Sequence, residues 1–188
     1  MIARILLAWL VVAGVAMPGA RAGAGPVRFR IQPDDSQLTF KATSLLQNAD
    51  GKFHRFSGDV FVDPDDLTTA RLMVSVDAAS IDTRIAKRDN HLRDEDFFYV
   101  ARFPTITFES FRVDPGPRPT VVGRLTLRGV TREVAVPVDL ELTPTSLVTR
   151  GEFTIKRTDY GINYQSFLNP VGDAVRVSFV FRGRPVPP

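Results

Sequence analysis

Apolar and polar residues alternate along most of the chain. In RLMVSVDA, residues 71–78, every second residue from Leu72 to Ala78 is apolar. Such alternation is typical of a β-strand with one buried face and one wet face. The same pattern occurs in eight segments: 36–43, 53–63, 71–78, 104–110, 123–129, 132–142, 151–157 and 174–182. The sequence therefore predicts an all-β protein of eight strands.

The face that segment 53–63 buries is the least regular part of this pattern. Phe56, Val60 and Val62 share one face, whereas Phe53 and Phe61 would favour the other. We expect Phe56, Val60 and Val62 to point inward, because Asp59 then points outward.

Turn-forming residues separate the predicted strands. They occur as DPDD at 63–66, DPGPRP at 114–119, RGVT at 128–131 and TPTS at 143–146. Short connections favour antiparallel neighbours, and eight such strands can close into a barrel that has no exposed edge. Two packed sheets would satisfy the same pattern, and so would a barrel with a solid core.

Four residues interrupt otherwise regular strands. Pro137 cannot donate a ladder hydrogen bond, so its position should lie at an edge or a bulge. Gly58, Gly123 and Gly151 fall within or at the start of strand patterns, and they are expected to mark bends at barrel corners or turn ends.

One dense charged segment, SIDTRIAKRDNHLRDEDFFYV at 80–100, lies between the third and fourth predicted strands. Ile85 and Leu92 are seven residues apart, which is helical spacing. Asp82 or Thr83 can cap the start of the helix. The segment is therefore predicted to be a short helical insert, where a tight turn would have sufficed.

Three interpretations of this insert compete. A charged helix that is wet on most faces can plug one end of the barrel. Alternatively, Arg84, Lys87 or Arg88 can bind the phosphate of a ligand head group.

The third interpretation is an acid–base site in which His91 acts with Asp94 or Glu95, and a hydrolase could also use the Asp159–Tyr160 region. The sequence contains no G-x-S-x-G, P-loop or H-E-x-x-H motif. It also shows no set of nucleophile, base and orienting group, so we expect a protein that is not an enzyme.

The N-terminus has the layout of a secretory signal peptide. A positively charged start (MIAR) precedes a short apolar run and a small-residue cleavage site. We expect residues 1–22 to be removed, with cleavage after Ala24 as the alternative, and residues 23–188 to form one domain. The protein would then work in the periplasm or be secreted; an uncleaved membrane anchor is the competing interpretation.

Cleavage changes the charge of the protein. The whole chain has 24 basic residues, and cleavage would remove two of them, Arg4 and Arg21. The remaining 22 basic and 21 acidic residues give a formal charge of +1. Basic and acidic residues interleave along the whole chain, which argues against a nucleic-acid partner. There is no cysteine and there are two histidines, which excludes disulfides and thiolate ligands and makes a metal site unexpected.

Four blocks of sequence resemble those of the YceI-like family, whose members are exported bacterial proteins similar in shape to lipocalins. They are SIDTRIAKRDNHLRDEDFF, FPTITFES, GRLTLRGVTREVAVPV and FTIKRTDYGI, and the resemblance runs from about Phe29 to Phe181. It implies an extended eight-stranded antiparallel barrel with an apolar tunnel for a polyisoprenoid, such as an isoprenoid quinone or a polyprenyl lipid.

The chain departs from that family pattern in two places. Tyr160 stands where the family usually has Phe, and its phenol is expected to add a hydrogen bond near the mouth of the tunnel. The tail GRPVPP at 183–188 is peculiar to this chain and is expected to be frayed.

The predicted ligand-binding wall follows from the inward strand faces. It consists of Phe40, Leu72, Val74, Val76, Ile106, Phe108, Leu125, Leu127, Val136, Leu140, Phe153, Ile155, Val177 and Phe179. The residues predicted to close one end or to contact a head group are Arg84, Arg88, Leu92, Phe97 and Tyr160, with Ile85 also turned toward the barrel.

The sequence as a whole thus predicts an exported carrier that holds a polyisoprenoid lipid, without a metal or another cofactor. The alternative function is a stress or interaction protein whose barrel holds no lipid. A homodimer is compatible with the sequence.

Overall fold

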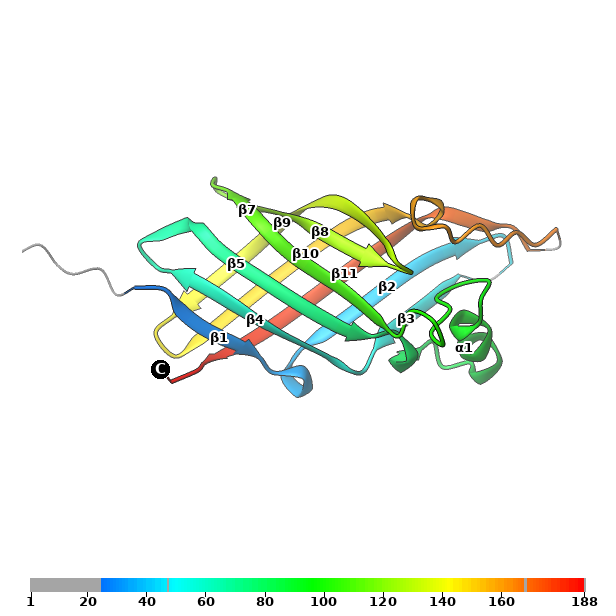
Figure 1. The fold of residues 1–188 in the computed structure, drawn as a ribbon, viewed down its shortest axis with the longest axis horizontal. Helices are drawn as coiled ribbons and strands as arrows, with labels where there is room; N and C mark the ends of the chain where they lie inside the picture. Colours follow the sequence, from blue (N-terminus) through cyan, green and yellow to red (C-terminus); the bar gives the residue numbers. More distant parts are fainter. Residues whose placement is uncertain (1–24, 47, 168, 188) are drawn as a thin grey trace, which may run out of the picture.

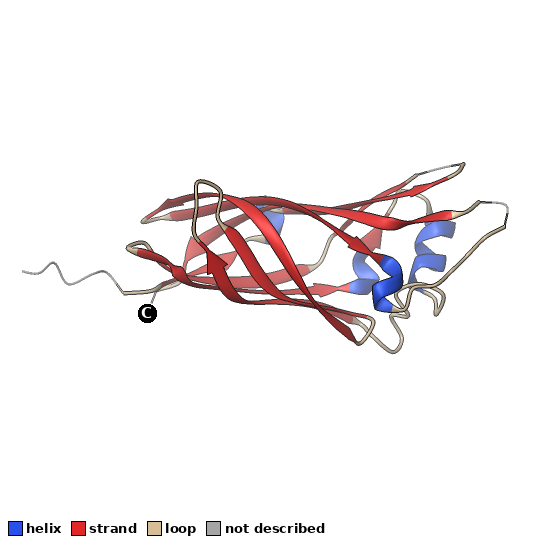
Figure 2. Ribbon diagram, turned by 90° about the horizontal axis from the view of Figure 1, so that it is seen from above, coloured by secondary structure: helices blue, strands red, loops and turns tan. Residues whose placement is uncertain are grey.

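Antiparallel strands close into an elongated barrel with one short helix at one end (Figures 1 and 2). The computed structural model describes residues 25–46, 48–167 and 169–187, so the predicted signal peptide lies outside the described residues. The strands are β1 (Val27–Ile31), β2 (Gln37–Ser44), β3 (Ala49–Phe53), β4 (Phe56–Asp63), β5 (Asp66–Asp77), β6 (Ile81–Asp82), β7 (Thr105–Asp114), β8 (Thr120–Leu127), β9 (Val130–Thr143), β10 (Ser146–Lys156) and β11 (Val171–Pro185).

Helical elements are short. The α-helix α1 spans Ala86–Arg93, and three 3₁₀ turns span Pro33–Asp35 (η1), Ala78–Ser80 (η2) and Arg157–Tyr160 (η3). Within the described ranges, no helix is long and apolar enough to cross a membrane.

The barrel closes through the order β1-β4-β5-β7-β8-β9-β10-β11, because β11 also pairs with β1. The strand β2 extends β11, and β3 and β6 follow it. The pairs β1/β2, β3/β4 and β5/β6 are therefore three interrupted wall strands. Counted in this way, the wall has eight strands in simple up-and-down order, which confirms the predicted eight-stranded antiparallel barrel and excludes two packed sheets.

The break between β3 and β4 explains the irregular pattern of segment 53–63. His54 and Arg55 lie between the two strands, and the Arg55 carbonyl accepts a hydrogen bond from Asp77 N at 3.0 Å. Because the break shifts the two-residue period, Phe53 and Phe56 both face the interior. The predicted inward orientation of Phe56 is confirmed, since only 7% of its surface is exposed.

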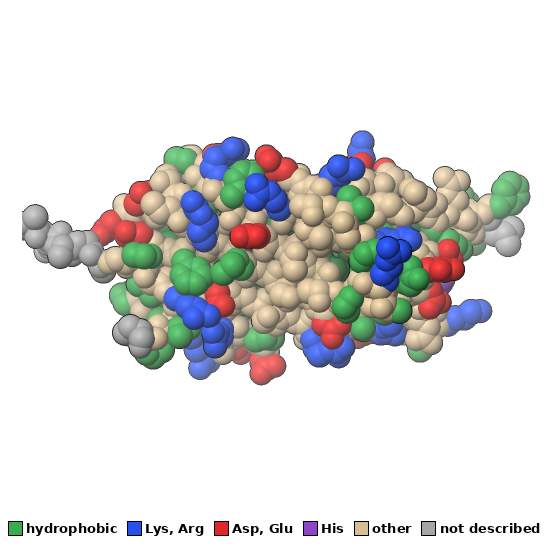
Figure 3. Space-filling model, in the orientation of Figure 1, with side chains coloured by type: hydrophobic (Ala, Val, Ile, Leu, Met, Phe, Trp, Pro, Cys, Tyr) green, Lys and Arg blue, Asp and Glu red, His purple; other side chains and the backbone are tan. Residues whose placement is uncertain are grey.

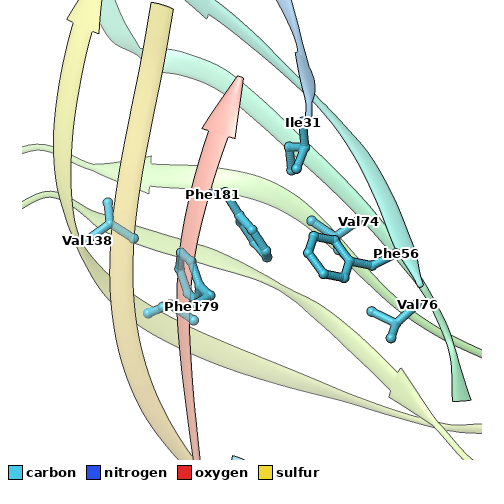
Figure 4. Close-up of a cluster of buried hydrophobic side chains, with 8 residues drawn as sticks. Ile31, Phe56, Val74, Val76, Val138, Phe179 and Phe181 are labelled. Carbon is cyan, nitrogen blue, oxygen red and sulfur yellow. The ribbon is translucent and has the colours of Figure 1, made fainter. Parts of the chain in front are cut away.

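The same part of the wall places Val60 and Val62 inside, as expected, and both are buried. Figure 4 shows how such side chains from different strands, among them Ile31, Phe56 and Phe181, point toward one another across the interior. The core is therefore built from the inward faces of strands that lie far apart in the sequence.

The C-terminal tail contradicts the expectation that it is frayed. Gly183, Arg184 and Pro185 pair with β1, and Val186 N donates a hydrogen bond of 2.8 Å to Arg28 O. This segment completes the closure of the barrel, and its ladder hydrogen bonds hold it in place.

Two of the irregular positions have clear structural roles. The ladder between β9 and β10 ends at Val138, so Pro137 lies at a local edge, as predicted. The predicted turn at 128–131 is a two-residue hairpin in which Arg128 and Gly129 have φ angles of 53° and 74°, as type I′ turns require.

The helical insert lies between the third and fourth wall strands, as predicted, but it is not capped as predicted. The N-cap residue of α1 is Ile85, which has no side-chain oxygen. Asp82 instead accepts the Arg84 N–H, and Thr83 donates its N–H and its hydroxyl to the buried Asp89 carboxylate. Ile85 is 37% exposed, so the expectation that it turns toward the barrel is wrong.

Candidate ligand-binding channel

The barrel interior contains a central cavity of about 160 Å³. Every predicted wall residue except Leu140 lines it. The predicted wall omitted further lining residues: Leu38, Phe53, Phe98, Thr107, Val121, Val138, Arg157, Ile162, Val175 and Phe181. Thr107 and Arg157 are the two polar residues of the lining, so the cavity is almost entirely apolar.

Two further spaces lie next to this cavity along the barrel axis. One is smaller than the central cavity, and the other has more polar residues in its lining. A distal cavity of about 60 Å³, at the end opposite α1, shares Leu72, Val121 and Val138 with the central cavity and contains Leu140. A chamber of about 240 Å³ lies at the α1 end and shares Phe40 and other residues with the central cavity. We call it the helix-end chamber. Each outer space shares lining residues with the central cavity, and we call the three spaces together the channel.

The helix-end chamber has a different chemical character from the rest of the channel. Its polar lining residues are Thr43, Ser44, Arg88, His91, Arg157, Tyr164, Ser166 and Asn169. The channel is therefore apolar over most of its length, and the helix-end chamber adds several polar groups to a mainly apolar lining. This arrangement is complementary to a long apolar chain with a small polar group.

Three phenylalanine rings of the central cavity occupy the space next to glycines of neighbouring strands. The pairs are Phe40 with Gly51, Phe108 with Gly123, and Phe179 with Gly151. A Cβ atom at any of these glycines would lie 2.5 Å from a ring carbon. Gly123 and Gly151 lie within β8 and β10 and not at turn ends, and Gly123 lies opposite a register irregularity between Ser110 and Arg112 of β7. Both glycines also let the rings lie against the wall, so the centre of the barrel stays open.

Gly58 has a related packing role. A Cβ atom there would lie 2.6 Å from the Met73 carbonyl oxygen and 2.8 Å from Ile31 Cδ1. The glycine is required because the neighbouring backbone and side chain approach this position closely.

Arg157 is the most unusual residue of the channel, because its guanidinium is buried beside an apolar cavity. It donates to the carbonyl oxygens of Gly172 at 3.1 Å, Val171 at 3.1 Å and Ile162. These bonds tie η3 to the start of β11 and to the loop between them. The alternation pattern contained a signal for this position, since Arg157 continues the inward series of Phe153 and Ile155.

The hydrogen bonds around Arg157 continue into β11. Thr158 donates its N–H and its hydroxyl to the Asp173 carboxylate at 3.1 and 2.8 Å. These two bonds, the backbone bond first, hold the pKa of Asp173 below its ordinary value. The helix-end rim is thus fixed by a connected polar network.

The structure separates the two arginines that were predicted to meet a head group. Arg88 lines the helix-end chamber, and its guanidinium donates to Thr83 Oγ1 at 2.8 Å, Thr83 O at 3.0 Å and Asn48 O at 3.2 Å. Arg84 is exposed and is not part of the chamber lining. Arg88 links the helical insert to the turn before β3.

His91 also lines the chamber, but its acidic partner differs from the expected one. Its Nε2 lies 3.2 Å from Asp96 Oδ2, so the pairing of His91 with Asp94 or Glu95 is wrong. The imidazole packs edge-on against Phe97 and Tyr164, with ring centroids 5.0 Å apart in both cases. This surrounds the ring with aromatic side chains. Across residues 25–46, 48–167 and 169–187, no group of three or more acidic or histidine side chains has the arrangement of a metal site.

The apolar residues of the insert face the barrel. Leu92 is buried, and Phe97 packs against the buried side chains of Leu125, Leu127 and Ile162. Both line the helix-end chamber. The insert therefore covers this end of the channel, as the plug interpretation predicted, and also contributes polar groups to it.

Tyr160 is placed differently from the prediction. It is 1% exposed and packs with Leu125, Leu127 and Ile162. Among the described residues, its hydroxyl group has no hydrogen-bond partner, so the expected bond near the mouth is absent. Burial raises the pKa of Tyr160 to about 12, and the nearby Asp159 charge adds to the rise.

We predict that Tyr160→Phe stabilises the protein. The substitution removes a buried hydroxyl without a partner and should raise the free energy of unfolding by about 1 kcal/mol at neutral pH. The unfolded tyrosine ionises near pH 10 and the folded one near pH 12, so the wild type loses stability as the pH rises through this interval. Between pH 10 and pH 12, the difference in the free energy of unfolding between the variant and the wild type should increase by roughly 2 kcal/mol. Urea unfolding at several pH values measures both effects.

The matched control is Tyr99→Phe, at a half-buried position on the loop after α1. An equal gain of stability for Tyr99→Phe, or a gap that does not change above pH 10, would contradict this account of Tyr160.

Comparison with known proteins places this chain in a known family. The model of the family described as YceI-like domain matches residues 29–182. A UPF0312 protein of Shewanella baltica is 37% identical over 134 residues, which is 70% of each chain. A UPF0312 protein of Staphylococcus aureus is 33% identical over 147 residues, covering 73% of this chain and 83% of the relative.

Two solved structures share the fold. BcnA of Burkholderia cenocepacia superposes with a TM-score of 0.75 at 24% identity, covering 81% of this chain and 98% of BcnA. A polyisoprenoid binding domain from Saccharophagus degradans gives a TM-score of 0.69 at 19% identity, covering 85% of this chain and 99% of that domain.

Proposed function

Because the chain belongs to the YceI-like family, we propose that it is a carrier that holds one polyisoprenoid chain in the barrel channel. An isoprenoid quinone and a polyprenyl lipid both have the required shape, which is a long branched hydrocarbon with one polar end. The observation that carries the proposal is the channel itself, which is apolar along the barrel and has polar groups in its lining at the α1 end. The name of the Saccharophagus degradans fold neighbour, a polyisoprenoid binding domain, supports the same ligand class.

The energy of binding comes mainly from the hydrocarbon. Burying apolar surface yields about 25 cal/mol per Å², or about 0.8 kcal/mol per methylene group, before the cost of ordering the chain is subtracted. Each isoprene unit should therefore matter more than any single charge at the rim. The residues that act are binding residues, and we propose no catalytic role for the channel.

We further propose that the protein works outside the cytoplasm, in the periplasm or the medium. A polyisoprenoid is insoluble in water, and a carrier with an enclosed apolar channel can move it through an aqueous compartment. The predicted signal peptide supports this location.

The test is to analyse freshly purified protein that has been expressed with its full N-terminus. Native mass spectrometry should show a bound mass, and solvent extraction should release an apolar chain of defined length. The intact mass should correspond to a chain that begins at Gly23 or Gly25. Protein that carries no extractable lipid would refute the carrier and favour the alternative of an interaction protein, and a chain that begins at Met1 would refute export with cleavage.

Gly151→Ala is predicted to reduce the lipid load. The new Cβ would lie 2.5 Å from Phe179 Cζ, so the ring must leave the wall and enter the central cavity. Alanine is compatible with the backbone of a strand, so the protein should still fold. We expect the lipid recovered per mole of protein to fall several-fold, because the displaced ring competes with the chain for a narrow space.

Gly116→Ala provides the control, since the nearest atom to a Cβ there is 4.0 Å away. The open-wall account would be refuted by a Gly151→Ala protein that is folded and fully loaded.

A further inference from the structure

Two neighbouring loops at the α1 end contain no charged residue. Residues 44–49 read SLLQNA and residues 162–172 read INYQSFLNPVG, whereas 24% of the whole chain is charged. The loops lie side by side, because Leu45 N donates to Pro170 O at 3.2 Å and Leu46 N donates to Asn169 Oδ1 at 2.9 Å. In Figure 1 they form the right-hand extremity of the molecule.

These loops expose large apolar side chains. Leu45 and Leu46 are each 73% exposed, and Phe167 is fully exposed. We call these three residues the apolar tip. The other exposed large hydrophobic residues among those described, Met73 and Ile85, are 43% and 37% exposed. Figure 3 shows hydrophobic side chains projecting at this right-hand end, beyond the charged side chains of the barrel surface.

The apolar tip adjoins the helix-end chamber of the channel. Ser44, Ser166 and Asn169 belong to the same two loops and line the helix-end chamber. The tip therefore lies close to the chamber through which a chain would enter or leave the barrel at this end. A water-insoluble chain has its source and its destination in a lipid bilayer, and exposed apolar residues without neighbouring charges are suited to a lipid surface.

We propose that the apolar tip inserts into the surface of a lipid bilayer and holds the helix-end chamber against it. The inference rests on the proposed function, because the tip adjoins a channel for a membrane lipid. Docking in this orientation lets the chain move between bilayer and barrel without exposure to water. The tip is thus a membrane contact and not a part of the binding wall.

The charges near the tip indicate how it binds. The insert exposes the cations Arg84 and Lys87 and the anions Asp94, Glu95 and Asp96. These opposite charges offset one another, so the tip does not depend on anionic lipids. Binding therefore comes from apolar insertion, and it should change little with ionic strength.

The test is flotation with phosphatidylcholine vesicles, using the triple variant Leu45→Gln, Leu46→Gln and Phe167→Gln. The wild type should bind these vesicles, and the triple variant should bind at least about tenfold more weakly, because three apolar side chains no longer enter the bilayer. Met73→Gln is the matched control for an exposed apolar residue away from the tip, and it should bind like the wild type. Raising the salt from about 0.05 to about 0.5 M should leave wild-type binding nearly unchanged.

Three results would overturn the inference: no binding of the wild type to phosphatidylcholine vesicles, equal binding by the triple variant, or binding that requires anionic lipid and low salt.

Solvent extraction separates this inference from the proposed function. The triple variant should retain as much lipid as the wild type, because no tip residue lines the channel, and it should transfer that lipid to vesicles more slowly. A wild-type barrel without lipid that still binds vesicles through the tip would refute the carrier function and support the membrane contact.

Discussion

Replacing Phe153 with aspartate is expected to empty the barrel of its lipid. Phe153 lines the central cavity and packs against two groups of buried side chains, one that contains Phe179 and one that contains Leu125. In the empty channel, water can solvate the new carboxylate. A bound hydrocarbon would expel that water and leave the charge unpaired, at a cost of several kcal/mol. Since about 1.4 kcal/mol is a factor of ten in affinity, the affinity of the barrel for the lipid should fall by roughly a hundredfold or more.

The measurement is lipid recovered per mole of folded protein, with circular dichroism to confirm the fold. Phe108→Asp should behave like Phe153→Asp, and Phe153→Leu should keep most of the lipid. Arg84→Ala should weaken retention only modestly, because Arg84 is exposed and outside the chamber lining. A loaded, folded Phe153→Asp protein together with an empty Arg84→Ala protein would place the binding site in the helical insert and refute the apolar-channel account.

Arg157→Met should cause the largest loss of stability. Methionine keeps the apolar stem of the side chain but removes the donors to Ile162 O, Val171 O and Gly172 O. Each buried acceptor left without a partner costs about 1 to 3 kcal/mol, and water can replace part of the loss near the chamber. We expect a decrease of about 3 to 5 kcal/mol in the free energy of unfolding, which corresponds to roughly 10 °C in Tm for a domain of this size.

Thermal denaturation with two further variants tests the cause. Arg157→Lys keeps the charge, but one ammonium group cannot reach three carbonyls in different directions, so its loss should be intermediate. Arg176→Met, at an exposed arginine that pairs with Glu152, should change the stability by less than about 0.5 kcal/mol. A Tm of Arg157→Met within about 2 °C of the wild type would show that the carbonyl network does not hold the rim together.

The alternation of residues was sufficient to predict the all-β architecture and most of the channel wall, but it left the choice between a closed barrel and two packed sheets open. A period of two places every second side chain on one face, and residues such as Val74, Phe108 and Val177 line the central cavity for that reason. The position of the helical insert was also readable, since its charges interrupt the apolar alternation. These features depend on local sequence, which the chain carries without reference to its fold.

Other features depend on contacts between distant segments, and the tertiary structure alone decides them. The alternation shifts between Phe53 and Phe56 because the wall strand is interrupted there. The Arg55 carbonyl in this interruption accepts a hydrogen bond from Asp77 N of the neighbouring wall strand. Gly151 keeps the lumen open only because β11 places Phe179 beside it.

The contacts of the polar groups also depend on segments that are distant in the sequence. The alternation could assign Arg157 to the inside, but its carbonyl partners lie on a loop and on β11. The tail at 183–186 looked unstructured because its proline-rich composition gives no local preference for a strand, yet β1 supplies the ladder that orders it. Sequence by itself determined which faces are apolar, because side-chain direction follows from backbone geometry. The open lumen, the fixed rim and the apolar tip were decided by the fold, because each requires two segments that only the closed barrel brings together.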